Sequence, residues 1–245
     1  WRLKTDRQTT ADELILACHT LFALDELCKE DITGFIVCSV VPVLEPVWLK
    51  FAERYFINLL SPPLAVSHQL DTGLRIQTPN PAELGADRLV NAVAAWESLA
   101  TALIVIDIGT AITFDCVSDK GEYLGGTIHP GLKISLEALS ERTAKLPCIC
   151  FNLHEKPAAV IGTSTTEAIR SGMLHGFGGL ISRMTELLGQ EMREQGATDG
   201  KISVIATGGM AEQLLPYSPA VEFVDPALTM TGLRILHERV CQETD

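Results

Sequence analysis

The sequence predicts an α/β fold, because apolar strands and amphipathic helices alternate along most of its 245 residues. Three observations support this prediction. Leu103–Ile108 is an apolar run with a single charged residue, Asp107, near its end. Two further apolar segments, Ile112–Val117 and Tyr123–Ile128, follow it after short turns, as in a strand meander. Ile202–Ala206 predicts another buried strand, followed by a glycine turn and a helix.

The remaining elements follow from helical spacing, β-branched runs and proline or glycine breaks. Thr10, with Glu13 three residues later, resembles a capping box at the start of the first helix. Four glycines in the longest helix predict close backbone packing; they are Gly172, Gly176, Gly178 and Gly179. We expect helices over Thr10–Leu27, Val47–Phe56, Pro81–Leu99, Leu132–Arg142, Thr165–Leu188 and Thr229–Cys241, a strand over Ile32–Val41, and short extended segments in Ser61–Val66 and Thr72–Ile76.

Composition excludes several classes of function. The formal net charge is −12 and Lys and Arg do not cluster, so a nucleic-acid partner is not expected. No apolar run reaches the roughly 18–20 residues of a membrane helix, and Trp1–Arg7 lacks the apolar core of a secretory signal. We therefore expect a cytoplasmic protein with no membrane partner.

The seven cysteines are expected to be free thiols, mostly buried, because their number is odd and no C-x-x-C pair occurs. The alternatives are a disulfide framework and a metal site. Cys148 and Cys150 would lie on one face of a strand, but no second ligand pair follows at metal-binding spacing.

The segment Asp107–Thr113 is the strongest candidate for a binding site. Gly109 lets backbone amides turn toward one point at the end of a buried strand, and Thr110 and Thr113 add hydroxyl groups. An Asp beside phosphate-binding amides is useful if it holds a cation. An ordinary Asp-Gly turn is the structural alternative.

Four further segments permit either a functional or a structural interpretation. Gly85–Arg88 could supply a proton acceptor and an anion-binding Arg, or simply begin a helix. Gly125–Leu132 suggests close approach of backbone or ligand, with His129 as an alternative base. Thr207–Gly209 could contact a nucleotide or form a tight turn. Gly162–Glu167 offers three hydroxyls for helix capping or, as a helix N-terminus, a carboxylate-binding site.

Seven segments in this order resemble the type III pantothenate kinase family, of the acetate/sugar kinase–Hsp70–actin superfamily. They are Arg7–Glu13, Ser39–Pro42, Gly85–Ala92, Asp107–Ala111, Gly125–Leu132, Thr143–Pro147 and Ala206–Gly209. The resemblance implies a two-lobed actin/ribonuclease H-like fold with a cleft, and we place the lobes at residues 1–99 and 100–245. It also implies a homodimer, with Pro81–Leu99 and Thr165–Leu188 as candidate interface helices.

The resemblance further implies ATP-dependent phosphorylation of pantothenate to 4′-phosphopantothenate, the first step of coenzyme A biosynthesis. Asp87 would be the catalytic base, and Asp107 would hold a monovalent cation, K⁺ or NH₄⁺. Mg²⁺ would arrive with ATP. The implied substrate-binding residues are Thr78, Gly85, Ala86, Asp87, Arg88 and Thr165, and the implied ATP-binding residues are Gly109, Thr110, Thr207, Gly208 and Gly209.

Two departures from the family pattern affect these expectations. The family places a strand and a first phosphate loop, Asp-x-Gly-Asn-Thr, before the position of Trp1. A first lobe without its N-terminal strand and this loop is expected to leave the chain as printed inactive. Thr78 stands where the family places an aromatic residue against pantothenate, so stacking area is lost there.

Two alternatives remain open at this point. One is a non-catalytic binding or regulatory protein, of the accessory-factor type, on the same scaffold. The other is a kinase of the same superfamily that acts on a sugar or acetate, against which the Gly85–Arg88 segment argues.

Overall fold

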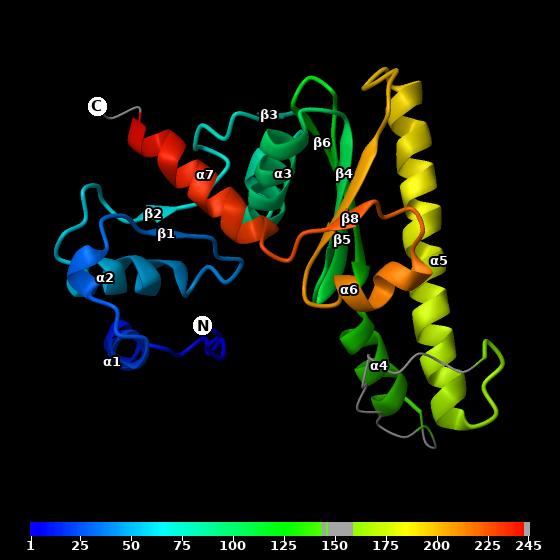
Figure 1. The fold of residues 1–245 in the computed structure, drawn as a ribbon, viewed down its shortest axis with the longest axis horizontal. Helices are drawn as coiled ribbons and strands as arrows, with labels where there is room; N and C mark the ends of the chain where they lie inside the picture. The colour runs from blue at the N-terminus through cyan, green and yellow to red at the C-terminus, as the bar shows by residue number, and fades with distance from the viewer. Residues whose placement is uncertain (144–145, 147–158, 243–245) are drawn as a thin grey trace. The chain divides into compact units, whose positions relative to one another are not determined.

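The computed structural model of the chain describes residues 1–143, 146 and 159–242, which form two compact units (Figure 1). One unit contains Trp1–Gly73, Asn80–Ala94 and the C-terminal helix from Thr229. The other contains Leu74–Pro79 and Ala95–Leu228. Each unit is built from separated stretches of the chain. The division into lobes at residues 1–99 and 100–245 stays a prediction.

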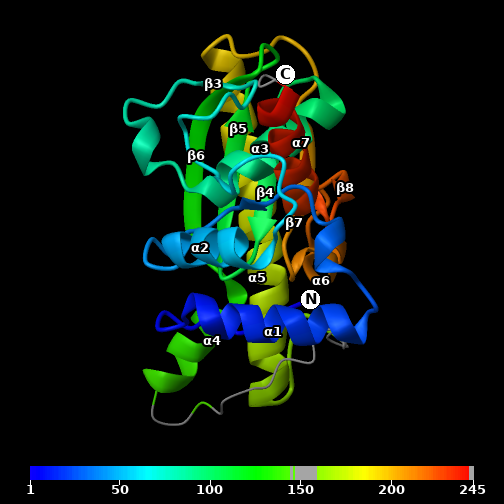
Figure 2. The ribbon, with the colours of Figure 1, turned by 90° about the vertical axis from the view of Figure 1, so that its left-hand side faces the viewer.

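A six-stranded mixed sheet organises the second unit, in the order β3-β6-β5-β4-β7-β8. β4, β5 and β6 form an antiparallel meander, whereas β7 runs parallel to β4 and β8 parallel to β7. Figure 2 shows the strands side by side in this order, with α5 behind them. The strands are β3 (Arg75–Ile76), β4 (Leu103–Ile108), β5 (Ala111–Val117), β6 (Glu122–Pro130), β7 (Ser203–Thr207) and β8 (Phe223–Val224). The predicted meander is confirmed.

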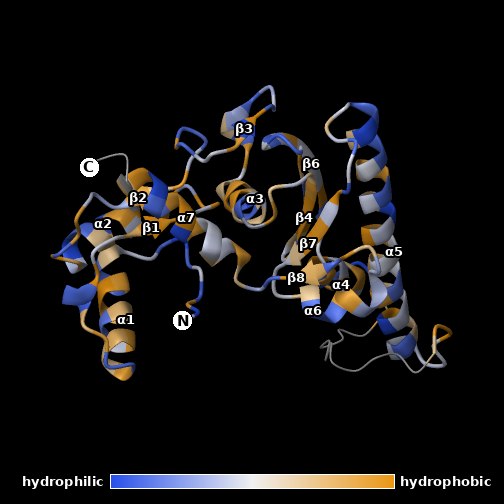
Figure 3. Cartoon of the chain, turned by 45° about the horizontal axis from the view of Figure 1, so that its top comes forward, coloured by the Kyte–Doolittle hydropathy of each residue, from blue (hydrophilic) through white to orange (hydrophobic). Residues whose placement is uncertain are grey.

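The core of this unit lies between the sheet and α5 (Thr165–Glu194). Side chains of β4 alternate between the two faces, so Ile104, Ile106 and Ile108 pack on the α5 side. Figure 3 shows the apolar strands in orange and polar residues in blue along α5. Among its described residues this unit also contains α4 (Leu132–Glu141), α6 (Ala211–Leu214) and the 3₁₀ turn η3 (Leu215–Tyr217). The sheet therefore presents the end of β4 and its turn on a rigid support.

The first unit has an aromatic core under two helices, α1 (Ala11–Leu24) and α2 (Glu45–Tyr55). Phe22, Phe51, Tyr55 and Phe56 pack against one another there. The predicted capping box is confirmed, because Thr10 and Glu13 satisfy each other's backbone amides. The unit also contains η1 (Lys29–Asp31), the parallel strands β1 (Ile36–Val37) and β2 (Leu64–Ala65), η2 (Pro81–Glu83), the first part of α3 (Ala86–Leu99), and α7 (Leu228–Gln242).

Three expectations about elements were wrong in extent. The helix expected from Pro81 begins at Ala86, because Pro81–Glu83 forms a 3₁₀ turn and Leu84 is extended. The strand expected over Ile32–Val41 is only Ile36–Val37, since the Ser39 hydroxyl bonds the Val41 backbone and holds a bend. The helix expected to end at Leu188 continues to Glu194, and the two-residue β8 was not predicted.

Close packing of the α5 glycines is confirmed at Gly178 only. A β-carbon there would collide with the Tyr217 backbone, whereas one at Gly172, Gly176 or Gly179 would meet nothing within 4 Å. Those three glycines face open space, so the packing argument does not apply to them.

The five described cysteines carry free thiols, as expected. Cys18 and Cys116 are buried, Cys38 and Cys241 are partly buried, and Cys28 is exposed. Cys148, Cys150 and most of Thr143–Pro147 lie outside the described residues. In the described part of the chain, no helix combines the length and the apolar character that a membrane span requires.

Candidate active site

The turn that follows β4 has the form predicted for a phosphate-binding turn. β4 and β5 pair up to Ile108 and Ile112, and the Gly109 amide donates to the Ala111 carbonyl oxygen at 2.9 Å. Thr110 is exposed at the tip of the turn, and Asp107 is partly exposed just before it. Exposed backbone and a carboxylate thus meet at the end of an otherwise buried strand.

The turn after β7 lies directly against this carboxylate. Asp107 and Thr207 are paired in the parallel register of β4 and β7. A β-carbon placed on Gly208 would stand 2.5 Å from Asp107 Oδ1 and 2.6 Å from the Ile108 carbonyl oxygen. Gly208 also has φ +94°, which residues with a side chain rarely adopt. Only glycine fits here, so the structure brings together two predicted segments that are distant in sequence.

A third glycine turn, at Gly131, packs against the backbone of the Gly109–Thr110 turn. The Gly131 amide donates to the Thr110 carbonyl oxygen at 3.0 Å. A β-carbon on Gly131 would collide with the carbonyl oxygens of Gly109 and Thr110. The close backbone approach predicted for Gly125–Leu132 is therefore confirmed at Gly131. His129, the alternative base in this segment, packs edge-on against Phe114 with ring centroids 6.0 Å apart.

The carboxylate of Asp107, the predicted cation ligand, is packed closely against glycine backbone. Its Oδ1 lies against the backbone of Gly208 and Gly109, where added β-carbons would stand 2.5 and 3.3 Å away. Among the described residues, no group of three or more His, Cys, Asp or Glu side chains could hold a metal ion.

The other predicted chemical segment, Gly85–Arg88, begins α3 in the first unit. Asp87 Oδ1 accepts a hydrogen bond from the Arg88 amide at 2.8 Å. A β-carbon on Gly85 would stand 2.7 Å from the same oxygen, so glycine leaves room for the carboxylate. Asp87 and Arg88 are both partly exposed.

Sequence reasoning missed Cys38 as a neighbour of Asp87. Burial, followed by the negative charges of Asp87 and Glu45, raises the pKa of the Cys38 thiol to about 12. The thiol is therefore neutral at physiological pH. The sequence feature that could have indicated Cys38 is its position directly before the family-like segment Ser39–Pro42.

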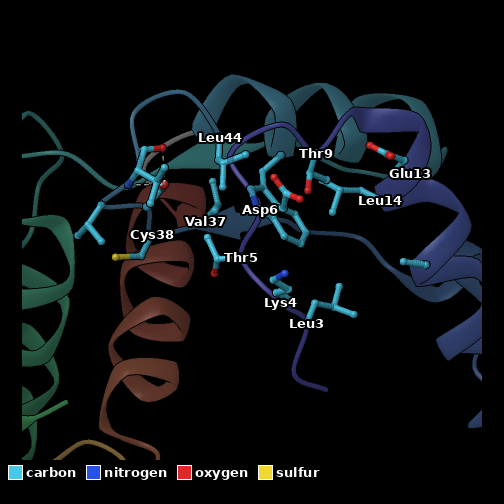
Figure 4. A pocket seen from close by; sticks show the side chains of 15 residues that line it. Leu3, Lys4, Thr5, Asp6, Thr9, Glu13, Leu14, Val37, Cys38 and Leu44 are labelled. Atoms are coloured by element: carbon cyan, nitrogen blue, oxygen red, sulfur yellow. Dashed lines mark hydrogen bonds between the residues drawn. The ribbon is translucent and has the colours of Figure 1, made fainter. Parts of the chain in front are cut away.

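Cys38 also lines a cavity of about 460 Å³ within the first unit (Figure 4). Val37 and Leu44 supply apolar walls, while Lys4 and Asp6 supply charged groups from the N-terminal segment. This cavity borders the strand that leads to Cys38, and it was not predicted from the sequence.

Thr78 and Thr165, the two remaining predicted substrate-binding residues, lie in the second unit. The Thr78 hydroxyl is buried and has no hydrogen-bond partner among the described residues, and its methyl group lies beside Gly125. Thr165 is the exposed first residue of α5, after the N-cap Ser164. Glu167 completes this cap, and the Thr163 hydroxyl and amide that bond it lower its pKa. Capping explains this segment without a ligand.

Strand-end glycine turns gathered around an accessible carboxylate define a nucleotide-dependent phosphotransferase of the α/β class. The sequence profile of the family described as type III pantothenate kinase matches residues 1–187. A type III pantothenate kinase of Desulfotalea psychrophila is 43% identical, over 96% of this chain and 88% of that protein. One of Desulfatibacillum aliphaticivorans is 43% identical, over 98% and 89%. The chain belongs to the type III pantothenate kinase family.

A solved structure supports the fold. A protein described as a Baf family transcriptional activator from Campylobacter jejuni superposes with a TM-score of 0.57. The match covers 89% of each chain at 20% sequence identity, and so concerns the fold alone.

Proposed function

We propose that the protein transfers the γ-phosphate of ATP to the primary hydroxyl group of pantothenate, giving 4′-phosphopantothenate for coenzyme A synthesis. Family membership supports the substrates. The observation that carries the reaction type is that the Gly109 and Gly208 turns meet at the Asp107 carboxylate, with Gly131 packed against the backbone of the Gly109–Thr110 turn. Phosphoryl transfer depends on alignment and charge neutralisation, which such turns provide.

The phosphate end of ATP is assigned to the turns after β4 and β7. Thr110 offers its backbone amide and hydroxyl at the exposed tip, and Gly109 beside it lets the chain turn there. Thr207, Gly208 and Gly209 take the nucleotide on the neighbouring turn, where Gly209 has open space around it. Backbone amides suit phosphate because they donate hydrogen bonds without a side chain that must be ordered.

Asp107 is proposed to hold K⁺ or NH₄⁺ beside these phosphates. The carboxylate lies against glycine backbone and is partly exposed, as such a site requires. When bound, the cation offsets phosphate charge. Mg²⁺ enters as part of the ATP complex.

Asp87 is proposed as the base that accepts the proton of the pantothenate hydroxyl. Its Oδ1 is held by the Arg88 amide, which fixes the carboxylate on the first turn of α3. Gly85 and Ala86 leave space beside it, and Arg88 supplies a cation for the pantothenate carboxylate. Thr78 and Thr165 are the further proposed contacts, and the buried, unbonded hydroxyl of Thr78 supports its assignment.

We also propose that the chain has an actin-like fold, with lobes at residues 1–99 and 100–245, and that the protein is a homodimer. The exposed side of α5 supports the second proposal, because Gly172, Gly176 and Gly179 are exposed and would let another helix approach closely. Sedimentation of the purified protein would contradict this proposal if it gave the mass of a monomer at all concentrations.

The reaction is tested with the protein as encoded by its gene, ATP, Mg²⁺, KCl and pantothenate, by following ADP and phosphopantothenate. We expect turnover that depends on pantothenate. Calorimetric binding of both substrates without turnover would overturn the catalytic assignment and favour a binding protein on this scaffold. Turnover with a sugar or acetate in place of pantothenate would overturn the substrate assignment.

A further inference from the structure

One face of the β4–β5–β6 meander carries a polar row that the proposed reaction does not use. Ile112, Phe114 and Cys116 pack on the α5 side of the sheet. The alternate residues Thr113 and Asp115 therefore point to the opposite face. Asp115 has an exposed fraction of only 1%, so a carboxylate is buried within the sheet layer.

Two hydroxyl groups hold this buried carboxylate. Tyr123 donates to Asp115 Oδ1 at 2.5 Å, and Thr113 Oγ1 donates to Oδ2 at 3.3 Å. A buried carboxylate is costly unless hydrogen bonds satisfy it, and hydrogen bonds to charged acceptors are the stronger ones. Both oxygens of Asp115 are thus engaged, one by a purely structural tyrosine and one by Thr113.

Thr113 lies directly opposite Asp107. The two residues are paired in the antiparallel register of β4 and β5, so their β-carbons stand about 4.5–5.5 Å apart on the same face. A threonine hydroxyl has one proton and two lone pairs. Because its proton is directed to Asp115, its lone pairs are free to face the Asp107 side.

We propose that Asp115 is a positioning residue for the Asp107 cation site. By accepting the Thr113 proton, it fixes the Thr113 oxygen as a neutral ligand beside the Asp107 carboxylate. The cation identity at Asp107 rests on the proposed function, whereas the Thr113–Asp115 arrangement rests on the described contacts. Without Asp115, the Thr113 proton turns toward the cation and repels it.

Four variants separate this role from a structural one. In Asp115→Asn, the side-chain amide can donate to Thr113 Oγ1, so the Thr113 hydroxyl accepts a hydrogen bond there instead of donating one. Thr113→Val removes the hydroxyl oxygen and keeps the shape of the side chain. Thr113→Ser keeps the oxygen. Tyr123→Phe is the matched control, because it removes the hydrogen bond from Tyr123 to Asp115 and leaves Thr113 in place.

Each protein is heated without substrates in KCl and in tetramethylammonium chloride at equal ionic strength, and the rise in Tm is titrated with K⁺. A ligand that binds only the folded state stabilises it by RT ln(1 + [L]/Kd), so at a given K⁺ concentration a weaker site gives a smaller rise in Tm. The K⁺ concentration for half-maximal kinase activity is measured in parallel. Asp115→Asn and Thr113→Val should both raise the half-saturating K⁺ concentration about tenfold or more, the loss of one ligand contact. Thr113→Ser and Tyr123→Phe should keep it, with a lower baseline Tm for Tyr123→Phe.

The proposal is overturned if Asp115→Asn and Thr113→Val keep the unaltered K⁺ response, or if Tyr123→Phe shifts it equally. If Asp115→Asn does not fold, an unaltered K⁺ response in Thr113→Val still overturns the proposal, because the oxygen that Asp115 is proposed to position would then not be a ligand. An unaltered protein that phosphorylates pantothenate but does not respond to K⁺ overturns the cation site and leaves the reaction intact. One that is stabilised by K⁺ but does not phosphorylate pantothenate overturns the reaction, and the shift in its Asp115→Asn variant still supports the positioning role.

Discussion

Asp107 and Gly208 are in contact across the end of the sheet: the carboxylate Oδ1 lies 2.5 Å from where a β-carbon of residue 208 would stand. The contact arises from the parallel pairing of β4 with β7, which places Asp107 level with Thr207. Two turns from distant parts of the sequence thereby share one carboxylate. The position and accessibility of that carboxylate depend on Gly208 having no side chain.

Gly208→Ala should therefore destabilise the protein and weaken ATP binding. The methyl group would collide with Asp107 and Ile108, and φ +94° is strained for alanine, at a cost of about 1–3 kcal/mol. Thermal unfolding and ATP calorimetry measure both effects. The neighbouring Gly209→Ala is the control for stability, because nothing lies within 4 Å of its added methyl group. Equal Tm values for the two variants would contradict the close contact.

Asp87→Asn should lower kcat by about 100- to 10,000-fold, the usual contribution of a general base. The amide keeps the size of the carboxylate and its bond to the Arg88 amide, so pantothenate should still bind. Steady-state kinetics and calorimetry separate turnover from binding. Glu83→Gln, an exposed carboxylate four positions earlier, should leave both unchanged. Full turnover by Asp87→Asn would remove Asp87 as the base.

The sequence was sufficient where structure is local. Apolar runs and short turns predicted β4, β5 and β6 to within a few residues, because the pairing of a meander involves neighbours along the chain. Capping at Thr10 and the glycine turn after Asp107 were predicted for the same reason. The start of α3 was not, since Pro81 at a helix-like position formed a separate 3₁₀ turn.

Non-local relationships could not be obtained from the sequence. Gly208 was a candidate, but its contact with Asp107 depends on the order of strands in the sheet. Asp115 was part of an apolar segment, and its hydrogen bond to Tyr123 depends on which faces of β5 and β6 meet. Cys38 and Asp87 are likewise brought together by the fold of the first unit. In each case the residue could be read from the sequence, but the residue that it contacts in the fold could not.

The glycines of α5 should respond oppositely to alanine. Gly178→Ala places a methyl group against the Tyr217 backbone, which should cost about 1–3 kcal/mol of unfolding free energy. Within one chain Gly176→Ala meets nothing within 4 Å on an exposed turn of the same helix, so in the dissociated monomer it should stabilise the helix by about 0.5–1 kcal/mol. Denaturant unfolding of both variants tests the difference. A loss of stability in Gly176→Ala that grows with protein concentration would support the proposed homodimer contact on this face, because the methyl group would then meet the second chain.

Cys38 should make the protein less stable as the pH rises above 9. The pKa of its thiol is about 12 in the folded protein and 9.0 in the unfolded chain, so between these values the unfolded chain has lost a proton that the folded protein retains. The contribution of the protonated Cys38 thiol to the free energy of unfolding is fully present below pH 9 and is lost progressively toward pH 12. The slope in that window approaches about 1.4 kcal/mol per pH unit for one proton. Cys38→Ala should remove this slope, whereas Cys28→Ala, at an exposed thiol, should keep it. Denaturant unfolding of the three proteins between pH 8 and pH 11 measures it, and identical slopes would show that the Cys38 thiol does not titrate differently on folding.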